Sequence, residues 1–102
     1  MTGRVRFTEA AETDLDDAVA WYAEQRPELS LAFLEAVNEV VDRIARAPLS
    51  FPMRIDDVRQ ANLPRRWPYA LWFVTEPDES IVIAALHHRR DPQMVWGRKP
   101  KL

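Results

Sequence analysis

The side chains best suited to chemistry gather in the second half of the sequence. Arginine guanidinium groups bind phosphates and carboxylates, and aromatic rings stack on bases or fill protein interfaces. Taken singly, most such residues are solvated surface arginines and core tryptophans. Both interpretations, a binding surface for RNA or protein and an ordinary surface, therefore stay open from the residues alone. The cluster consists of Arg59, Arg65, Arg66, Arg89, Arg90, Arg98, Lys99 and Lys101, with Trp67, Trp72, Trp96, His87 and His88.

Other kinds of site are disfavoured. His87 and His88 are adjacent, so in an extended strand end they point to opposite faces and make a poor joint metal pair. Gly3 and Gly97 are the only glycines, and neither lies in a glycine-rich loop that could hold a nucleotide phosphate. The acidic residues of the first predicted helix are typical of a solvated face rather than a paired acid and base. We therefore expect no cofactor and no metal.

Composition sets the general class. The chain has 102 residues, of which 47% are hydrophobic and 29% charged, and it has no cysteine, so we expect one domain over residues 1–102 in a reducing compartment. No leader-like apolar segment and no membrane-length apolar run is present, which predicts a cytoplasmic protein. The net charge is −2, with an acidic first half and a modestly basic second half. That basic excess is too small to predict sequence-specific DNA binding by this chain alone.

The first half predicts a strand and two helices. Val5 and Phe7 alternate with arginines, as in a strand with one face on a core. Thr8 can cap a helix that runs to about Glu24. The expected buried stripe of this helix is Ala11, Leu15, Ala18 and Tyr22, with Asp14, Asp16 and Asp17 mostly outward.

Pro27 suits the first turn of a second helix, which Pro48 should end near Ala47. Its expected buried stripe is Leu34, Val37, Val41 and Ile44. A short connector over residues 48–52 should then lead into the second half of the chain.

Three further strands are predicted at about Arg54–Asn62, Tyr69–Thr75 and Ile81–His87, forming a meander. The last of them is the most apolar run and should be central in the sheet. We therefore predict an α+β fold: an N-terminal strand and an antiparallel two-helix hairpin packed on a small, mainly antiparallel β-sheet. The open face of that sheet is where we expect function.

The order of several short motifs resembles the RelE/ParE toxin superfamily over nearly the whole chain. The opening combines a strand, a capped helix and the aromatic pair Trp21-Tyr22. The second half adds Leu63-Pro64, Trp67-Pro68-Tyr69, the apolar strand, and the ending His87-His88-Arg89-Arg90-Asp91-Pro92 followed by Trp96.

The resemblance implies a toxin of a type II toxin–antitoxin system and two possible mechanisms. ParE-like members poison DNA gyrase by binding, whereas RelE-like members are ribosome-dependent mRNA endonucleases. The segment His87-His88-Arg89-Arg90-Asp91-Pro92 looks ParE-like. Residues 91–102 contain no tyrosine to act as a nuclease acid or base. The binding mechanism is therefore favoured, with the endonuclease and a non-toxic interacting homologue as alternatives. For gyrase binding we expect Arg89, Arg90, Trp96 and Arg98 to contact the target, with packing of Trp96 back onto the sheet as the equal alternative for that residue. For a nuclease, Arg59, His87, His88 and Arg89 would be catalytic.

The resemblance also implies growth inhibition, plasmid stabilization and a cognate antitoxin, which we expect to be a DNA-binding protein encoded next to the toxin. An antitoxin tail would cover apolar surface and pair acidic residues with basic ones. The expected contacts are Trp21, Phe33 and Trp72, if exposed, for apolar packing, and Arg59, Arg65 and Arg66 for charge pairing. A place in the core is the alternative for each of them.

Overall fold

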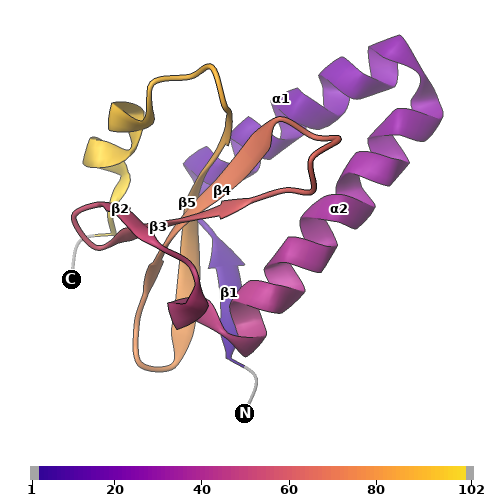
Figure 1. The fold of residues 1–102 in the computed structure, drawn as a ribbon. Helices are drawn as coiled ribbons and strands as arrows, with labels where there is room; N and C mark the ends of the chain where they lie inside the picture. Colours follow the sequence, from indigo (N-terminus) through magenta and orange to yellow (C-terminus); the bar gives the residue numbers. More distant parts are fainter. Residues whose placement is uncertain (1–2, 101–102) are drawn as a thin grey trace.

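A computed structural model describes residues 3–100, so Lys101 of the basic cluster lies outside the described residues. The described residues form two α-helices, five strands and two 3-10 segments, and the predicted α+β architecture is confirmed (Figure 1). In chain order these are β1 (Arg4–Phe7), α1 (Glu9–Gln25), α2 (Pro27–Arg46), η1 (Pro48–Ser50), β2 (Met53–Ile55), β3 (Val58–Asn62), β4 (Tyr69–Thr75), β5 (Glu79–His87) and η2 (Pro92–Arg98).

The helix boundaries follow from local chemistry, as predicted. The Thr8 hydroxyl accepts the Ala11 N–H at 3.2 Å and so caps the start of α1. Arg26 is extended, and Pro27 takes the first position of α2, where no N–H is needed. Pro48 prevents α2 from continuing past Ala47.

The buried stripe of α2 differs in phase from the prediction. Val37 and Ile44 are buried as expected, but Leu34 and Val41 are only half-buried. Phe33 sets the phase, because its ring packs against three aromatic rings from α1, the β3–β4 loop and β4: those of Tyr22, Trp67 and Tyr69. The stripe that results is Phe33, Ala36, Val37, Val40 and Ile44.

The strand predicted over residues 54–62 is wrong: this segment is a hairpin of β2 and β3. The chain reverses at Asp56 and Asp57, and Ile55 pairs with Val58. Asp56 has φ 50°, a left-handed conformation that aspartate tolerates better than most residues.

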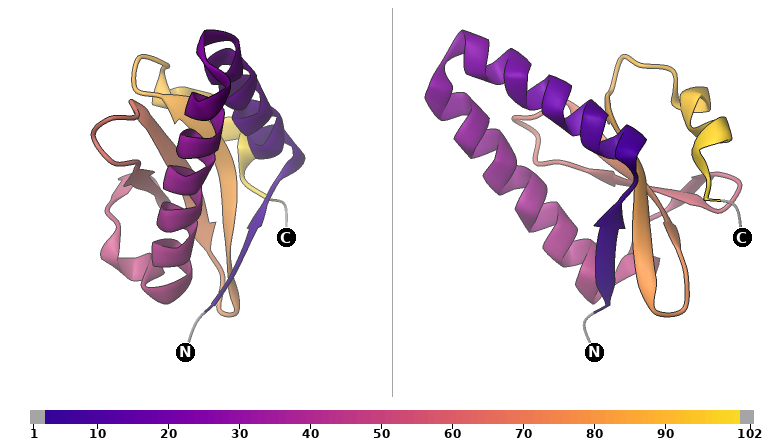
Figure 2. Two further views of the ribbon diagram at one scale, coloured as in Figure 1. Left: turned by 90° about the vertical axis from the view of Figure 1, so that its right-hand side faces the viewer. Right: turned by 180° about the vertical axis from the view of Figure 1, so that it is seen from behind.

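The five strands form one mixed sheet in the order β1-β5-β4-β3-β2. The predicted meander of β3, β4 and β5 is antiparallel, and β1 adds in parallel beside β5. This places β5 inside the sheet, as predicted. Both helices lie on one face, over a core that includes Phe33, Ile44 and Phe73 (Figure 2).

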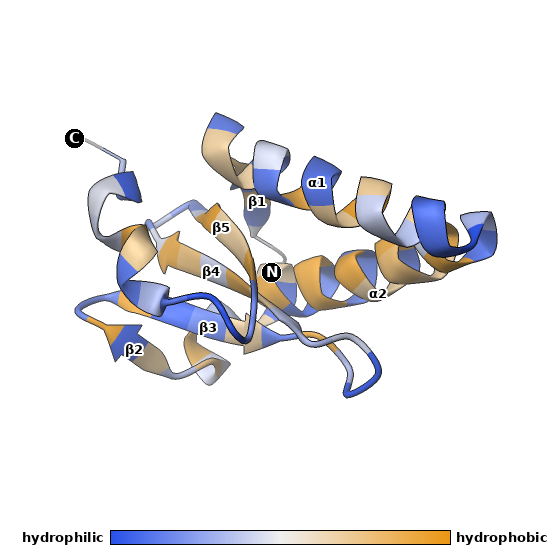
Figure 3. Ribbon diagram, turned by 90° about the horizontal axis from the view of Figure 1, so that it is seen from above, coloured by the Kyte–Doolittle hydropathy of each residue, from blue (hydrophilic) through white to orange (hydrophobic). Residues whose placement is uncertain are grey.

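The second face of the sheet is covered, not open as predicted. Figure 3 shows the C-terminal segment on the side of the sheet opposite the helices. Val95 of η2 is fully buried there in a second apolar cluster with Trp72, Ile83 and Leu86. The open part of the surface therefore lies at the sheet ends and edges.

Among residues 3–100, no helix combines the length and the apolar character needed to cross a membrane.

Candidate functional site

Two adjoining hollows lie between α1 and the end of β5. Both are lined by Trp21, Tyr69, His87 and Arg90. One continues toward Asp14 and Asp17, and the other toward Arg89. We call this surface, made of Trp21, Tyr69, His87, Arg89 and Arg90, the His87 groove.

Aromatic rings form one wall of the His87 groove. The Tyr69 and His87 rings meet edge to face, with centroids 5.1 Å apart. The Trp21 side chain is 54% exposed, and its ring contacts that of Tyr22 at the same centroid distance of 5.1 Å. Burial raises the pKa of Tyr69, against the opposing influence of Arg90, so Tyr69 stays a neutral phenol at physiological pH.

His87 is held as a neutral imidazole with a defined tautomer. Its Nδ1 accepts the Arg89 backbone N–H at 3.0 Å, which leaves the proton on Nε2. Burial, followed by the nearby Arg89 and His88, lowers the pKa of His87. In this state Nε2 carries the ring's proton and can act as a donor, and the ring has no free lone pair to act as a base.

A β-bulge in β5 brings His87 to this face. Phe73 pairs with Val82, but Trp72 pairs with Ala84, so Ile83 is an extra residue. Ile83 and Ala84 both lie in the cluster on the tail side, whereas Ala85 faces the helices.

Asp14 and Arg98 bind the backbone at this bulge. An Asp14 carboxylate oxygen accepts the Ala85 N–H at 3.1 Å, and the Arg98 guanidinium donates to the Ile83 carbonyl at 3.2 Å. The two side chains also form a bidentate ion pair, with Nη1–Oδ2 2.5 Å and Nη2–Oδ1 3.3 Å. The prediction that Asp14 faces outward is therefore wrong. The Arg98 guanidinium is bonded to Asp14 and the Ile83 carbonyl, so it is not free to contact a target.

Arg59 lies far from the other predicted nuclease residues. It pairs with Phe73, about 13 Å along β4 from Tyr69 at ~3.3 Å per residue. Its guanidinium donates to the Phe51 carbonyl at 2.6 Å, and so ties β3 to the connector. His87, His88 and Arg89 are consecutive at the groove, but the four-residue nuclease set is not assembled.

The predicted antitoxin contacts divide into exposed and buried residues. Arg65 and Arg66 are exposed on the β3–β4 loop, and Trp21 is exposed on α1. Phe33 and Trp72 are 1% and 6% exposed, so the expectation that they are exposed is wrong. Phe33 packs in the aromatic cluster under the helices, and Trp72 packs in the cluster beneath η2.

The tail extends the groove surface. Arg90 donates to the Met94 sulfur at 3.4 Å, which joins the groove to η2. Trp96 is 54% exposed on η2, and its neighbour Val95, not Trp96, anchors the tail to the sheet. Arg89 and Arg90 have no ion-pair partner within residues 3–100.

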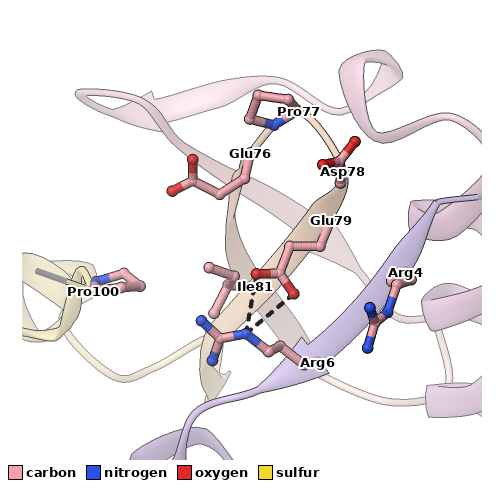
Figure 4. A pocket seen from close by; sticks show the side chains of 8 residues that line it. All are labelled: Arg4, Arg6, Glu76, Pro77, Asp78, Glu79, Ile81 and Pro100. Carbon is pink, nitrogen blue, oxygen red and sulfur yellow. Dashed lines mark hydrogen bonds and ion pairs between the residues drawn. The ribbon is translucent and has the colours of Figure 1, made fainter. Parts of the chain in front are cut away.

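A separate hollow lies near the β4–β5 turn, beside β1. Figure 4 shows Arg6 bonded to Glu79, with Arg4, Glu76 and Asp78 around them. The nearest Arg6 Nε–Glu79 Oε1 distance is 3.2 Å. Acidic and basic groups are mixed here and aromatic rings are absent from its lining, so this hollow is a weaker candidate than the His87 groove. In the described part of the chain, no group of three His, Asp or Glu side chains is placed to hold a metal ion.

Sequence reasoning identified His87, Arg89, Arg90 and Trp21, but missed Tyr69 and Asp14. The sequence predicts Tyr69 as the start of a strand and as part of the Trp67-Pro68-Tyr69 motif, but not as a residue of the site. Its pairing with His87 could be found only by aligning β4 with β5. Asp14 resembles its solvated neighbours, and no signal in the sequence sets it apart.

Comparison with known proteins agrees with this architecture. The family described as "ParE toxin of type II toxin-antitoxin system, parDE" matches residues 5–92. Comparison with curated proteins gave no match.

Two solved structures share the fold. One is described as the chromosomal ParDE system from P. aeruginosa, with TM-score 0.73, 22% identity, and coverage of 84% of this chain and 96% of that chain. The other is the toxin–antitoxin complex RelBE2 from Mycobacterium tuberculosis, with TM-score 0.56, 20% identity, and coverage of 85% and 99% respectively.

Proposed function

This chain belongs to the ParE toxin family of type II toxin–antitoxin systems, and we propose that it inhibits DNA gyrase by binding, through the surface around the His87 groove. The fold hosts more than one mechanism, so the proposal depends on the site itself. The proposed result is arrested growth, and the proposed place of action is the cytoplasm, where gyrase works on DNA.

One observation carries the proposal: the groove has the groups for recognition, while its best acid–base candidate is occupied. Arg89 and Arg90 are exposed cations and Trp21 is an exposed ring, which are residue types that dominate binding surfaces. The Nδ1 of His87 is taken by the Arg89 N–H, so the ring cannot accept a proton without losing that bond.

We propose that an antitoxin neutralises the toxin by covering exposed apolar and basic residues. The two solved structures that share the fold are described as toxin–antitoxin systems, which supports such a partner. Trp21, Arg65 and Arg66 are exposed and suited to an acidic tail with apolar anchors. The proposed antitoxin is a DNA-binding protein encoded beside this chain.

An mRNA endonuclease is the second candidate, and the contact of Tyr69 with His87 favours it. A phenol and an imidazole stand beside two arginines, which are groups that could move protons and stabilise phosphate charge. The raised pKa keeps Tyr69 as the un-ionised phenol at physiological pH, and Nδ1 of His87 is occupied. Neither group is then available as a base, which places this function second.

A gyrase assay tests the proposal. Purified toxin is incubated with gyrase, ATP and relaxed plasmid, and supercoiling and protein-linked DNA breaks are measured. We expect inhibition by the parent chain and at least about tenfold weaker inhibition by Arg89→Ala/Arg90→Ala, because the loss of two interface arginines commonly costs over 1.4 kcal/mol.

The control is Arg4→Ala/Arg54→Ala, which removes the same charge from exposed residues outside the groove. It should inhibit gyrase like the parent. The endonuclease would be supported instead if gyrase is unaffected and the chain cleaves mRNA on the ribosome. In that case His87→Ala/His88→Ala should abolish the cleavage. Failure of both assays would favour a non-toxic interacting homologue.

A further inference from the structure

The β5 bulge decides which face of the sheet carries His87. Side chains alternate between the two faces of a strand, so every residue beyond an inserted one changes face. Val82 faces the helices, and uninterrupted alternation would turn His87 toward the tail side. The extra Ile83 restores the helix side for Ala85 and for His87, which then meets Tyr69.

The end of β1 leaves backbone groups of β5 near the bulge without strand partners. β1 pairs with β5 only as far as Val82, so the edge of β5 beyond this residue has no neighbouring strand. At that edge, Asp14 accepts the Ala85 N–H and Arg98 donates to the Ile83 carbonyl. Since the two side chains also bond each other, the two backbone groups and two side chains form one connected network.

This network is sheltered. The side chains of Arg98 and Asp14 are 21% and 16% exposed, unlike the other ion pairs described, each of which has at least one partner more than half exposed. Charge-assisted bonds are stronger than neutral ones and lose less strength to solvent when they are sheltered.

We propose that Asp14 and Arg98 are a coupled positioning pair: by bonding the bulge of β5 they keep His87 in the groove, and they make the groove depend on the C-terminal tail. Neither side chain needs to touch the target. The inference deepens the proposed function, because it explains how the proposed binding surface is held in shape.

The proposal is tested on the free chain, by nuclear magnetic resonance and amide hydrogen exchange. The gyrase result therefore does not affect the outcome. The chain has only two histidines, so the His87 ring can be followed directly, with the exposed His88 as an internal control. The two readouts are the His87–Tyr69 ring contact and the exchange rate of the Ala85 amide.

Arg98→Met keeps an unbranched, flexible side chain and removes the guanidinium group with its charge and donors. We expect Ala85 exchange at least about tenfold faster, loss of the His87–Tyr69 contact, and a His87 titration that moves upward. Asp14→Asn keeps an oxygen for the Ala85 N–H and weakens only the ion pair, so its effect should be smaller. Combining the two should add little to Arg98→Met alone, because both act through one network.

Lys99→Met is the matched control. Lys99 also ties the tail, but its ion pair, at 2.6 Å, is with Asp57 in the β2–β3 turn and not with the bulge. It should leave both readouts unchanged. Equal effects of Lys99→Met and Arg98→Met would show that general tail docking is responsible, and would overturn the proposal. Parent-like readouts in Arg98→Met would also overturn it.

If Arg98→Met or Asp14→Asn does not fold, Arg98→Lys decides the question. This variant keeps the charge and one donor but cannot bind the carboxylate and the carbonyl with a planar fork. Arg98→Lys should raise the Ala85 exchange rate and weaken the His87–Tyr69 contact, both to a smaller extent. Parent-like values of both readouts would overturn the proposal.

Discussion

Tyr69 and His87 stand opposite each other in the β4–β5 ladder, and their rings meet edge to face at the mouth of the groove. The same imidazole accepts a backbone hydrogen bond on Nδ1. Protonation of His87 must break that bond and place a cation beside Arg89. The protonation state of one side chain is thus coupled to the shape of the proposed binding surface.

Stability should fall as the pH falls through the range in which His87 titrates. Its folded-state pKa lies below the ordinary 6.5, so the unfolded chain binds more protons in this range. The stabilisation is complete above pH 6.5 and is lost as the pH falls through the folded pKa. Urea unfolding of the parent should show a lower midpoint at pH 5.5 than at pH 7.5. His87→Gln should reduce this difference, while His88→Gln should keep it; an unchanged difference in His87→Gln would refute this explanation.

Phe33 and Trp21 should behave oppositely on truncation. Phe33→Ala empties the centre of the aromatic cluster and should lower the free energy of unfolding by about 3–5 kcal/mol. Trp21→Ala removes an exposed ring and one edge contact, which should cost at most about 1.5 kcal/mol. Chemical denaturation measures both. With the proposed antitoxin, Trp21→Ala should bind more weakly although it remains folded, and undiminished binding would exclude Trp21 from the interface.

The turn of the β2–β3 hairpin requires a left-handed backbone conformation at Asp56. Its φ of 50° disfavours branched side chains, so Asp56→Val should destabilise the protein by about 1–2 kcal/mol. Asp56→Gly should be neutral or slightly stabilising, because glycine adopts this conformation without strain. Thermal unfolding of the two variants should differ in this order, and the reverse order would mean that the turn does not have this geometry.

Arg59 should prove structural. Arg59→Ala leaves the Phe51 carbonyl without its donor and should cost about 1–3 kcal/mol. The exposed neighbour Arg54 serves as the control, since Arg54→Ala should change stability by less than about 0.5 kcal/mol. Toxicity per folded molecule should be the same in both variants. A stable but inactive Arg59→Ala protein would show that Arg59 has a functional role and is not only structural.

Local signals accounted for the parts of the fold that depend on short segments. Thr8, Pro27 and Pro48 mark helix boundaries by mechanisms that act within one turn, and the predicted boundaries agree with the structure to within one residue. The continuous apolar composition of the last strand predicted that it lies inside the sheet, although the middle strand is β4.

The errors occur where tertiary contacts choose between similar patterns. Residues 81–86 are all apolar, so no alternation reveals a bulge at Ile83. Asp14 looks like Asp16 and Asp17 until Arg98 is placed beside it. Trp96 is the larger side chain in the tail, yet Val95 enters the core because the 3-10 segment turns that position toward the sheet. Phe33 and Trp72 are predicted to contact an antitoxin, but each is buried in one of the two apolar clusters.

The parallel pairing of β1 with β5 also affects when the protein can fold during synthesis. Arg4 pairs with Glu79, and Asp14 reaches Arg98 across 84 residues, so most of the chain must exist before either contact can form. Contacts between such distant segments form late and slow the folding of small domains. On the ribosome, α1 and α2 emerge after β1 but before the other four strands, so they lack the sheet on which they pack. The groove can be completed only after Arg98 has left the exit tunnel, so the nascent chain does not yet carry the surface that we propose binds gyrase.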